Sequence, residues 1–129
     1  MADKKILIID DDPDIIEPMK VVLESRGYKI ETAMDSKKGL EKADSFRPNL
    51  IILDVMMETN QAGFEAARVL KQSDLHKNTP IIMLTAVKEK TGINFKDAAG
   101  DEAWLPVDDF CDKPLKPDQL LDKVSRFIG

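Results

Sequence analysis

The sequence NLIILD at Asn49–Asp54 decides the fold, because apolar residues fill every position between a polar start and a final aspartate. A strand covered by helices on both faces has this continuous apolar pattern, whereas a strand with one wet face alternates. The same pattern occurs in KKILIID at Lys4–Asp10 and in PIIMLT at Pro80–Thr85. These three segments are therefore predicted to be central strands of a parallel sheet.

Two further strands and four helices are predicted around this centre. The segment Tyr28–Ala33 alternates between apolar and polar residues, which indicates an edge strand, and Val107–Cys111 is a weaker fifth strand. Helical periodicity occurs at Pro13–Arg26, Ser36–Phe46, Gly63–Leu75 and Pro117–Ile128. Alternating strands and helices predict a doubly wound α/β fold, with a five-stranded parallel sheet in the flavodoxin-like order 2-1-3-4-5.

The segment between the fourth and fifth strands, Val87–Pro106, fits this alternation poorly. By alternation another helix, the fourth in chain order, belongs there, but the segment contains Gly92 and Gly100 and only scattered apolar residues. The fold prediction therefore includes an atypical long segment at this place.

Composition limits the class of protein. The chain has 129 residues, which predicts a single domain over residues 1–129. Its formal net charge of −5 argues against nucleic-acid binding, which needs a basic surface. No apolar run is long enough for a membrane span or a signal peptide, and the single Cys111 excludes an intrachain disulfide. We therefore expect a cytoplasmic protein that binds neither nucleic acid nor membrane.

Polar side chains follow the central strands where each strand ends. Asp10 and Asp11 follow the first strand, Asp54 ends the third, and Thr85 ends the fourth. Lys113 comes just after the fifth strand. In an open parallel sheet, ligands bind beyond the carboxyl ends of the strands, where the strand order reverses. We therefore expect the three aspartates to meet at this edge.

Such a meeting of carboxylates needs a cation. Two carboxylates about 5 Å apart repel by roughly 3 kcal/mol at an effective dielectric constant of about 20. Hard oxygen ligands suit Mg²⁺. With Mg²⁺, the Lys113 ammonium and the Thr85 hydroxyl would form a receptor for phosphoryl oxygens. A carboxylate within that receptor can act as the nucleophile that forms an acyl phosphate.

Four blocks of the sequence, in the order ILIIDDD, LIILDVMM, IIMLTA and FCDKPL, resemble the signature blocks of response regulator receiver domains. The resemblance covers essentially the whole chain. It implies that Asp54 accepts the phosphate and that Asp10 and Asp11 hold Mg²⁺, with Asp11 as the direct ligand. It also implies that the backbone carbonyl of Met56 contributes to the metal site.

The same resemblance assigns the remaining polar residues. Thr85 corresponds to the switch hydroxyl, Lys113 to the lysine that pairs with the phosphate, and Phe110 to the aromatic residue that moves with the switch. The implied partner is a histidine kinase or a phosphotransfer protein. The implied activity is a regulated switch, and the chain would catalyse only its own phosphorylation and dephosphorylation.

Three other functions compete with this one. A phosphatase of the haloacid-dehalogenase type also uses a strand-end aspartate, and Asp10-x-Asp12 superficially fits it. However, Pro13 follows where a Gly-Thr-like turn is expected, and Asp54 would be unexplained. A pseudo-receiver would keep the fold as an interaction module without phosphorylation. A flavodoxin is disfavoured, because the loop after the first strand is acidic and lacks residues that cradle a flavin phosphate.

Two polar residues are expected to have structural roles. Asp12 is predicted to cap the first helix rather than to bind metal, since aspartate is favoured at helix N-termini. His76 lies between a helix end and Pro80 and is predicted to be an exposed loop or capping residue, not a phosphoryl carrier.

Overall fold

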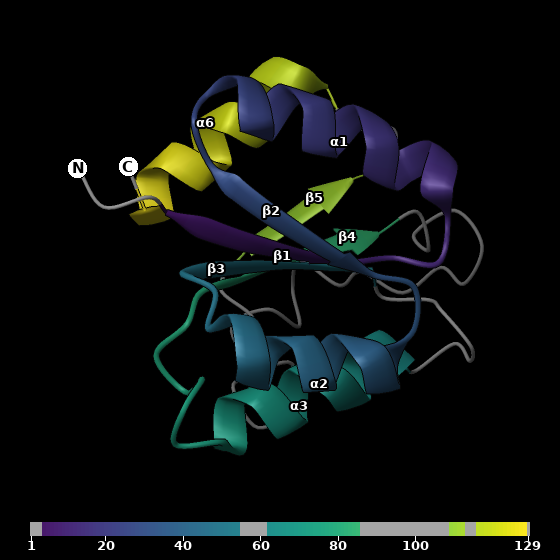
Figure 1. Cartoon of the computed structure of the whole chain (residues 1–129), viewed down its shortest axis with the longest axis vertical. Coiled ribbons are helices and arrows are strands. Elements are labelled where there is room, and N and C mark those ends of the chain that lie inside the picture. Colours follow the sequence, from purple (N-terminus) through teal and green to yellow (C-terminus); the bar gives the residue numbers. More distant parts are fainter. Residues whose placement is uncertain (1–3, 55–61, 86–108, 113–115, 129) are drawn as a thin grey trace.

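Five parallel strands form one sheet in the order β2-β1-β3-β4-β5. The computed structural model describes residues 4–54, 62–85, 109–112 and 116–128. The strands are β1 (Lys5–Ile9), β2 (Lys29–Ala33), β3 (Leu50–Asp54), β4 (Ile81–Thr85) and β5 (Asp109–Asp112). The helices are α1 (Pro13–Ser25), α2 (Ser36–Phe46), α3 (Ala62–Gln72) and α6 (Pro117–Ile128). Figure 1 shows α1 and α6 on one face of the sheet and α2 and α3 on the other.

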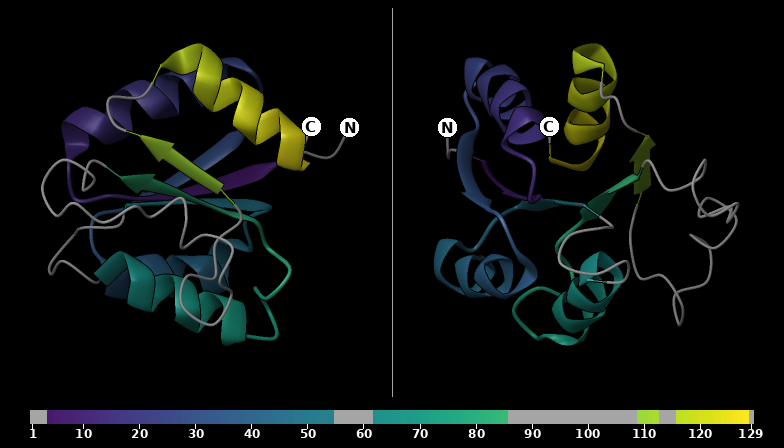
Figure 2. Two further views of the ribbon diagram at one scale, coloured as in Figure 1. Left: turned by 180° about the vertical axis from the view of Figure 1, so that it is seen from behind. Right: turned by 90° about the vertical axis from the view of Figure 1, so that its right-hand side faces the viewer.

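This architecture confirms the predicted doubly wound fold and the predicted strand order. β2 lies at the edge of the sheet, as its alternating sequence indicated, and β1, β3 and β4 lie inside it. The helices α2 and α6 have the predicted bounds, and α3 ends at Gln72, earlier than Leu75. The atypical segment Val87–Pro106, where the alternation of strands and helices would place another helix, lies outside the described residues. Figure 2 shows the same layers from two further directions.

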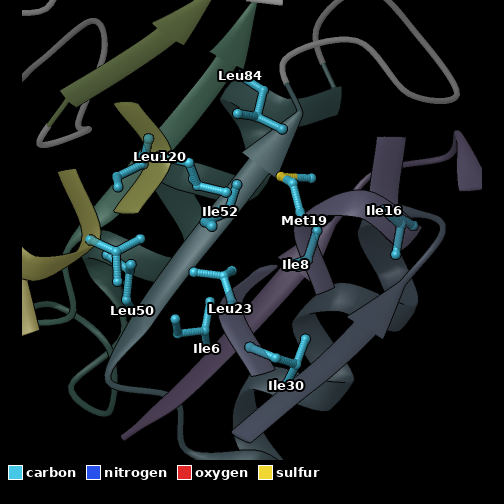
Figure 3. Close-up of a cluster of buried hydrophobic side chains, with 12 residues drawn as sticks. Ile6, Ile8, Ile16, Met19, Leu23, Ile30, Leu50, Ile52, Leu84 and Leu120 are labelled. Carbon is cyan, nitrogen blue, oxygen red and sulfur yellow. The ribbon is translucent and has the colours of Figure 1, made fainter. Parts of the chain in front are cut away.

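The continuous apolar strands divide their side chains between two cores. Ile51 and Leu53 of β3 belong to the cluster on the side of α2 and α3. Leu50 and Ile52 belong to the cluster on the side of α1 and α6, as Figure 3 shows. Successive residues of a strand point to opposite faces, so a strand covered on both faces must be apolar at every position.

The helix α1 presents a slightly different stripe to the core from the predicted one. The helical periodicity of the sequence predicts one apolar stripe made of Ile15, Met19, Val22 and Leu23. The fully buried residues are Ile16, Met19 and Leu23, while Ile15 and Val22 are half-buried. Ile15 still packs against the edge of the cluster. The prediction was thus wrong by one position at the helix start.

Aspartates cap the two helices that follow β1 and β2. The side chain of Asp12 accepts a hydrogen bond from the backbone N–H of Asp14 at 2.9 Å, which confirms its predicted role. For α2, the sequence offers both Ser36 and Asp35 as candidate N-caps. The cap is Asp35, whose carboxylate accepts from the Lys38 N–H at 2.7 Å. Both caps satisfy N–H groups that have no partner within the helix.

His76 is buried, with 2% of its surface exposed, so the prediction of an exposed loop residue was wrong. Its Nε2 lies 2.9 Å from Oδ1 of Asp44, near the end of α2. The turn after α3 folds back on itself, because the His76 N–H donates to the Ser73 carbonyl and its own carbonyl accepts from Thr79. That turn brings the imidazole to α2, where the polar ring has a hydrogen-bond partner.

Removing this ring should lower stability. We expect His76→Ala to reduce the free energy of unfolding by about 2 kcal/mol, through the lost hydrogen bond and the space left behind. Urea unfolding followed by circular dichroism would measure the change. Leu75→Ala is a matched control, because Leu75 is the neighbouring residue and is 50% exposed. A loss for His76→Ala no larger than that for the control would contradict the assigned role.

Candidate functional site

Three carboxylates meet at the carboxyl ends of β1 and β3. Each of Asp10, Asp11 and Asp54 offers one oxygen, and these oxygens lie within 4.8 Å of one another. The register explains the meeting, since Ile9 pairs with Leu53 and each residue immediately precedes one of the buried aspartates. The predicted convergence of the three aspartates is therefore observed. Among the described residues, no other group of three or more potential metal ligands comes together in this way.

The two strand-end aspartates are buried and the third is not. Asp10 is 0% exposed and Asp54 is 4% exposed, whereas Asp11 is exposed. Charged carboxylates are rarely buried unless another group compensates their charge. The site thus has a buried acidic floor and one acidic side chain at its mouth.

Two hydrogen bonds fix Asp10, one through its backbone and one through its side chain. Its N–H donates to the carbonyl of Ala33 at the end of β2, at 3.0 Å. Its Oδ1 accepts from the N–H of Asp12 at 3.0 Å, and Asp12 in turn caps α1. The three consecutive aspartates therefore differ in role: one is fixed in the floor, one faces solvent and one starts the helix.

The donor set fits a magnesium ion. All three groups are carboxylates, and Mg²⁺ prefers hard oxygen ligands in octahedral geometry at about 2.1 Å. In such an octahedron, neighbouring and opposite oxygens lie roughly 3 to 4 Å apart. The three carboxylate oxygens lie within 4.8 Å of one another, so they would need to move only slightly closer together to bind the ion. Without a cation, each pair at that separation repels by roughly 3 kcal/mol at an effective dielectric constant of about 20. The residues present therefore suit the predicted ion.

The other predicted site residues are only partly described. Thr85 is the last residue of β4 and pairs with Asp112, one position beyond the Asp54–Leu84 pair. Phe110 lies in β5, where its backbone pairs with Met83. The side chains of Thr85 and Phe110, and all of Met56 and Lys113, lie outside the described residues. Their roles remain predictions.

Sequence reasoning missed one residue that contacts Asp10 in the floor of the site and one that contacts the preceding residue, Ile9. Ala33 accepts the N–H of Asp10 through its carbonyl, and Gly39 of α2 lies against Ile9, the residue before Asp10. The predicted adjacency of the first two strands could have indicated Ala33. The contact between Gly39 and Ile9 joins a helix to a strand and has no signal in the sequence pattern.

The described helices include none that is both long enough and apolar enough to cross a membrane.

Comparison with known proteins identifies a family for this chain. Residues 6–125 match the family described as the response regulator receiver domain. The transcriptional regulatory protein PhoP for alkaline phosphatase synthesis, from Bacillus subtilis strain 168, is 37% identical over 125 residues. The match covers 97% of this chain and 48% of PhoP, and the chain spans about half the length of the first curated relatives it matches.

Solved structures agree in fold over nearly the whole chain. The chemotaxis response regulator CheY4 of Vibrio cholerae is 31% identical with a TM-score of 0.79, and the match covers 98% of this chain and 100% of CheY4. The signal receiver domain of a signal transduction histidine kinase from Syntrophus aciditrophicus is 30% identical with a TM-score of 0.80. That match covers 97% of this chain and 89% of the other.

Proposed function

Because the chain belongs to the response regulator receiver domain family, we propose that Asp54 is its phosphoryl acceptor. The family resemblance expected from the sequence is confirmed, and the chain is a receiver domain of two-component signalling rather than a conventional catalyst. The observation that carries the assignment of Asp54 is its nearly buried carboxylate, within 4.8 Å of those of Asp10 and Asp11.

In the proposed reaction, a carboxylate oxygen of Asp54 attacks the phosphorus of a phosphohistidine. A P–O bond forms, the P–N bond breaks, and its electron pair returns to the imidazole, which takes up a proton. Asp10, Asp11, Asp54 and the Met56 carbonyl would hold Mg²⁺, with Asp11 as a direct ligand. When bound, Mg²⁺ supplies positive charge that offsets the negative charge of the phosphoryl oxygens.

The remaining predicted residues would read the phosphorylated state. The Lys113 ammonium pairs with a phosphoryl oxygen, and the Thr85 hydroxyl donates a hydrogen bond to another. Phe110 then turns into the space that Thr85 leaves. The new group carries a charge of about −1.5 to −2 at neutral pH. Phosphorylation would thereby switch a protein-interaction face between two conformations. A shift of this equilibrium from 1:99 to 99:1 in favour of the active conformation would need about 5.5 kcal/mol of differential stabilisation.

The proposed donor is a histidine kinase or a phosphotransfer protein. The relatives differ in what accompanies the receiver: PhoP is a transcriptional regulator, and the Syntrophus aciditrophicus domain belongs to a kinase. The output of this chain therefore does not follow from its family. We propose that this domain itself contacts proteins rather than nucleic acid, in keeping with its net charge of −5. The cytoplasmic location and the single domain over residues 1–129 stay predictions.

A small phosphoryl donor tests the proposal without any partner. Incubation with acetyl phosphate and Mg²⁺ is expected to add one phosphoryl group to the protein as an acyl phosphate, which hydroxylamine cleaves. Chelation of Mg²⁺ should prevent the reaction, because the uncompensated carboxylates repel an anionic donor. Intact mass spectrometry measures the uptake.

Two results would oppose the proposal. Failure to take up phosphate under these conditions would favour the pseudo-receiver alternative. Continuous turnover of a generic phosphomonoester would favour the phosphatase alternative, which family membership does not support.

A further inference from the structure

The helix α2 lies in direct contact with the end of β1 at Gly39. A Cβ atom added to Gly39 would lie 2.6 Å from Cδ1 of Ile9 and 2.9 Å from both its Cγ1 and Cγ2. Carbon atoms in contact prefer separations of about 3.5 to 4.0 Å. Any side chain at this position therefore requires either Ile9 or the helix to move.

Ile9 has little freedom to move. It is fully buried within the cluster beneath α2 and α3. As the last residue of β1, it pairs with Ala33 on one side and with Leu53 on the other. Tightly packed interiors transmit such a displacement instead of absorbing it.

The local backbone does not explain a glycine at this position. Gly39 lies inside α2, where glycine is less favourable than alanine. Gly27 is different, because its φ of 90° suits glycine. The close approach of α2 to β1 is therefore the reason that position 39 requires a residue without a Cβ atom.

Two connections lead from this contact to the acidic floor. Ile9 directly precedes Asp10, so a shift of Ile9 displaces the carboxylate that follows it. Ala33 accepts the Asp10 N–H and is separated by Met34 from Asp35, the cap of α2. A helix pushed away from Ile9 would therefore also pull on the carbonyl that holds Asp10.

We propose that Gly39 is a positioning residue. By allowing α2 to pack directly against Ile9, it fixes the position of Asp10 and Asp11 at the carboxyl edge of the sheet. The inference rests on the proposed function, since it takes these carboxylates as the Mg²⁺ ligands. It predicts that the fit between Gly39 and Ile9 controls the affinity for Mg²⁺ from outside the metal site.

The test compares Mg²⁺ titrations of wild type and four variants, which are Gly39→Ala, Ile9→Val/Gly39→Ala, Ile9→Val and Glu41→Ala. Relative to wild type, Gly39→Ala should bind Mg²⁺ roughly tenfold more weakly, a loss typical of disturbed supports of a metal site. Phosphorylation by acetyl phosphate should fall at low Mg²⁺ and recover at saturating Mg²⁺. Ile9→Val/Gly39→Ala should bind with intermediate affinity, because valine lacks only the Cδ1 atom of the shortest contact. Glu41→Ala, at an exposed position of the same helix, should match wild type.

Each outcome decides the matter. A variant that is only less stable would bind Mg²⁺ normally at temperatures where it is folded, so normal affinity of folded Gly39→Ala overturns the inference. If Gly39→Ala does not fold, Ile9→Val/Gly39→Ala is compared with Ile9→Val, and equal affinities overturn it. If wild type binds no Mg²⁺, the proposed function fails first and the inference fails with it.

Discussion

Replacing Asp54 by asparagine is expected to abolish phosphorylation of this chain by acetyl phosphate. The reaction needs an anionic oxygen that attacks phosphorus, and a neutral amide does not provide one. Asparagine has almost the same size as aspartate, so the nearly buried position at the end of β3 should keep its packing. The loss should therefore reflect missing chemistry and not a missing fold.

The experiment has a matched control in Asp74→Asn. Asp74 has a side chain that is 98% exposed, so this variant makes the same substitution away from the acidic floor. Wild type and the control should each take up one phosphoryl group, and Asp54→Asn should take up none. Circular dichroism verifies folding of all three proteins. Full phosphorylation of Asp54→Asn, at Asp12 or at any other carboxylate, would show that the acceptor was assigned wrongly.

The fold was largely predictable because its strands are covered on both faces. An apolar residue at every position of Leu50–Asp54 before the final aspartate is difficult to reconcile with any other environment. The alternation of Tyr28–Ala33 likewise separated the edge strand from the inner ones. Helix ends were less predictable, because the choice between Asp35 and Ser36 as the cap depends on backbone geometry that sequence does not specify.

The acidic floor was predictable for a different reason. Parallel strands end at one edge, so residues that are distant in the chain, such as Asp10 and Asp54, come together once the strand order is known. Contacts between different layers follow no such rule. The partner of His76 is Asp44 on another helix, and the partner of Gly39 is Ile9 beneath it. Periodicity indicates which face of an element is buried, but not which atoms it meets.

Replacing Asp10 by asparagine is expected to stabilise the protein in the absence of Mg²⁺, by about 3 kcal/mol. Asp10 is fully buried, and its carboxylate lies within 4.8 Å of two others. Each pair of carboxylates repels by roughly 3 kcal/mol at an effective dielectric constant of about 20. The repulsion between Asp10 and Asp11 is weaker than this, because Asp11 is exposed to solvent and its ions. The amide oxygen of asparagine can still accept the Asp12 N–H that Oδ1 accepts now. The substitution therefore removes repulsion and preserves the turn into α1.

Magnesium should offset most of this advantage, because a ligand that binds only the folded state stabilises it by about 2.7 kcal/mol at a hundredfold excess over Kd. Wild type should gain more from Mg²⁺ than Asp10→Asn, which lacks one of the three carboxylates. Urea unfolding with a chelator and with saturating Mg²⁺ measures both effects, and Asp74→Asn should change neither by more than about 0.5 kcal/mol. If Asp10→Asn is less stable than wild type in the chelator, hydrogen bonding at Asp10 outweighs charge repulsion. In that case the acidic floor would stabilise the fold even without Mg²⁺. The idea that repulsion between its carboxylates destabilises the protein until Mg²⁺ binds would then be wrong.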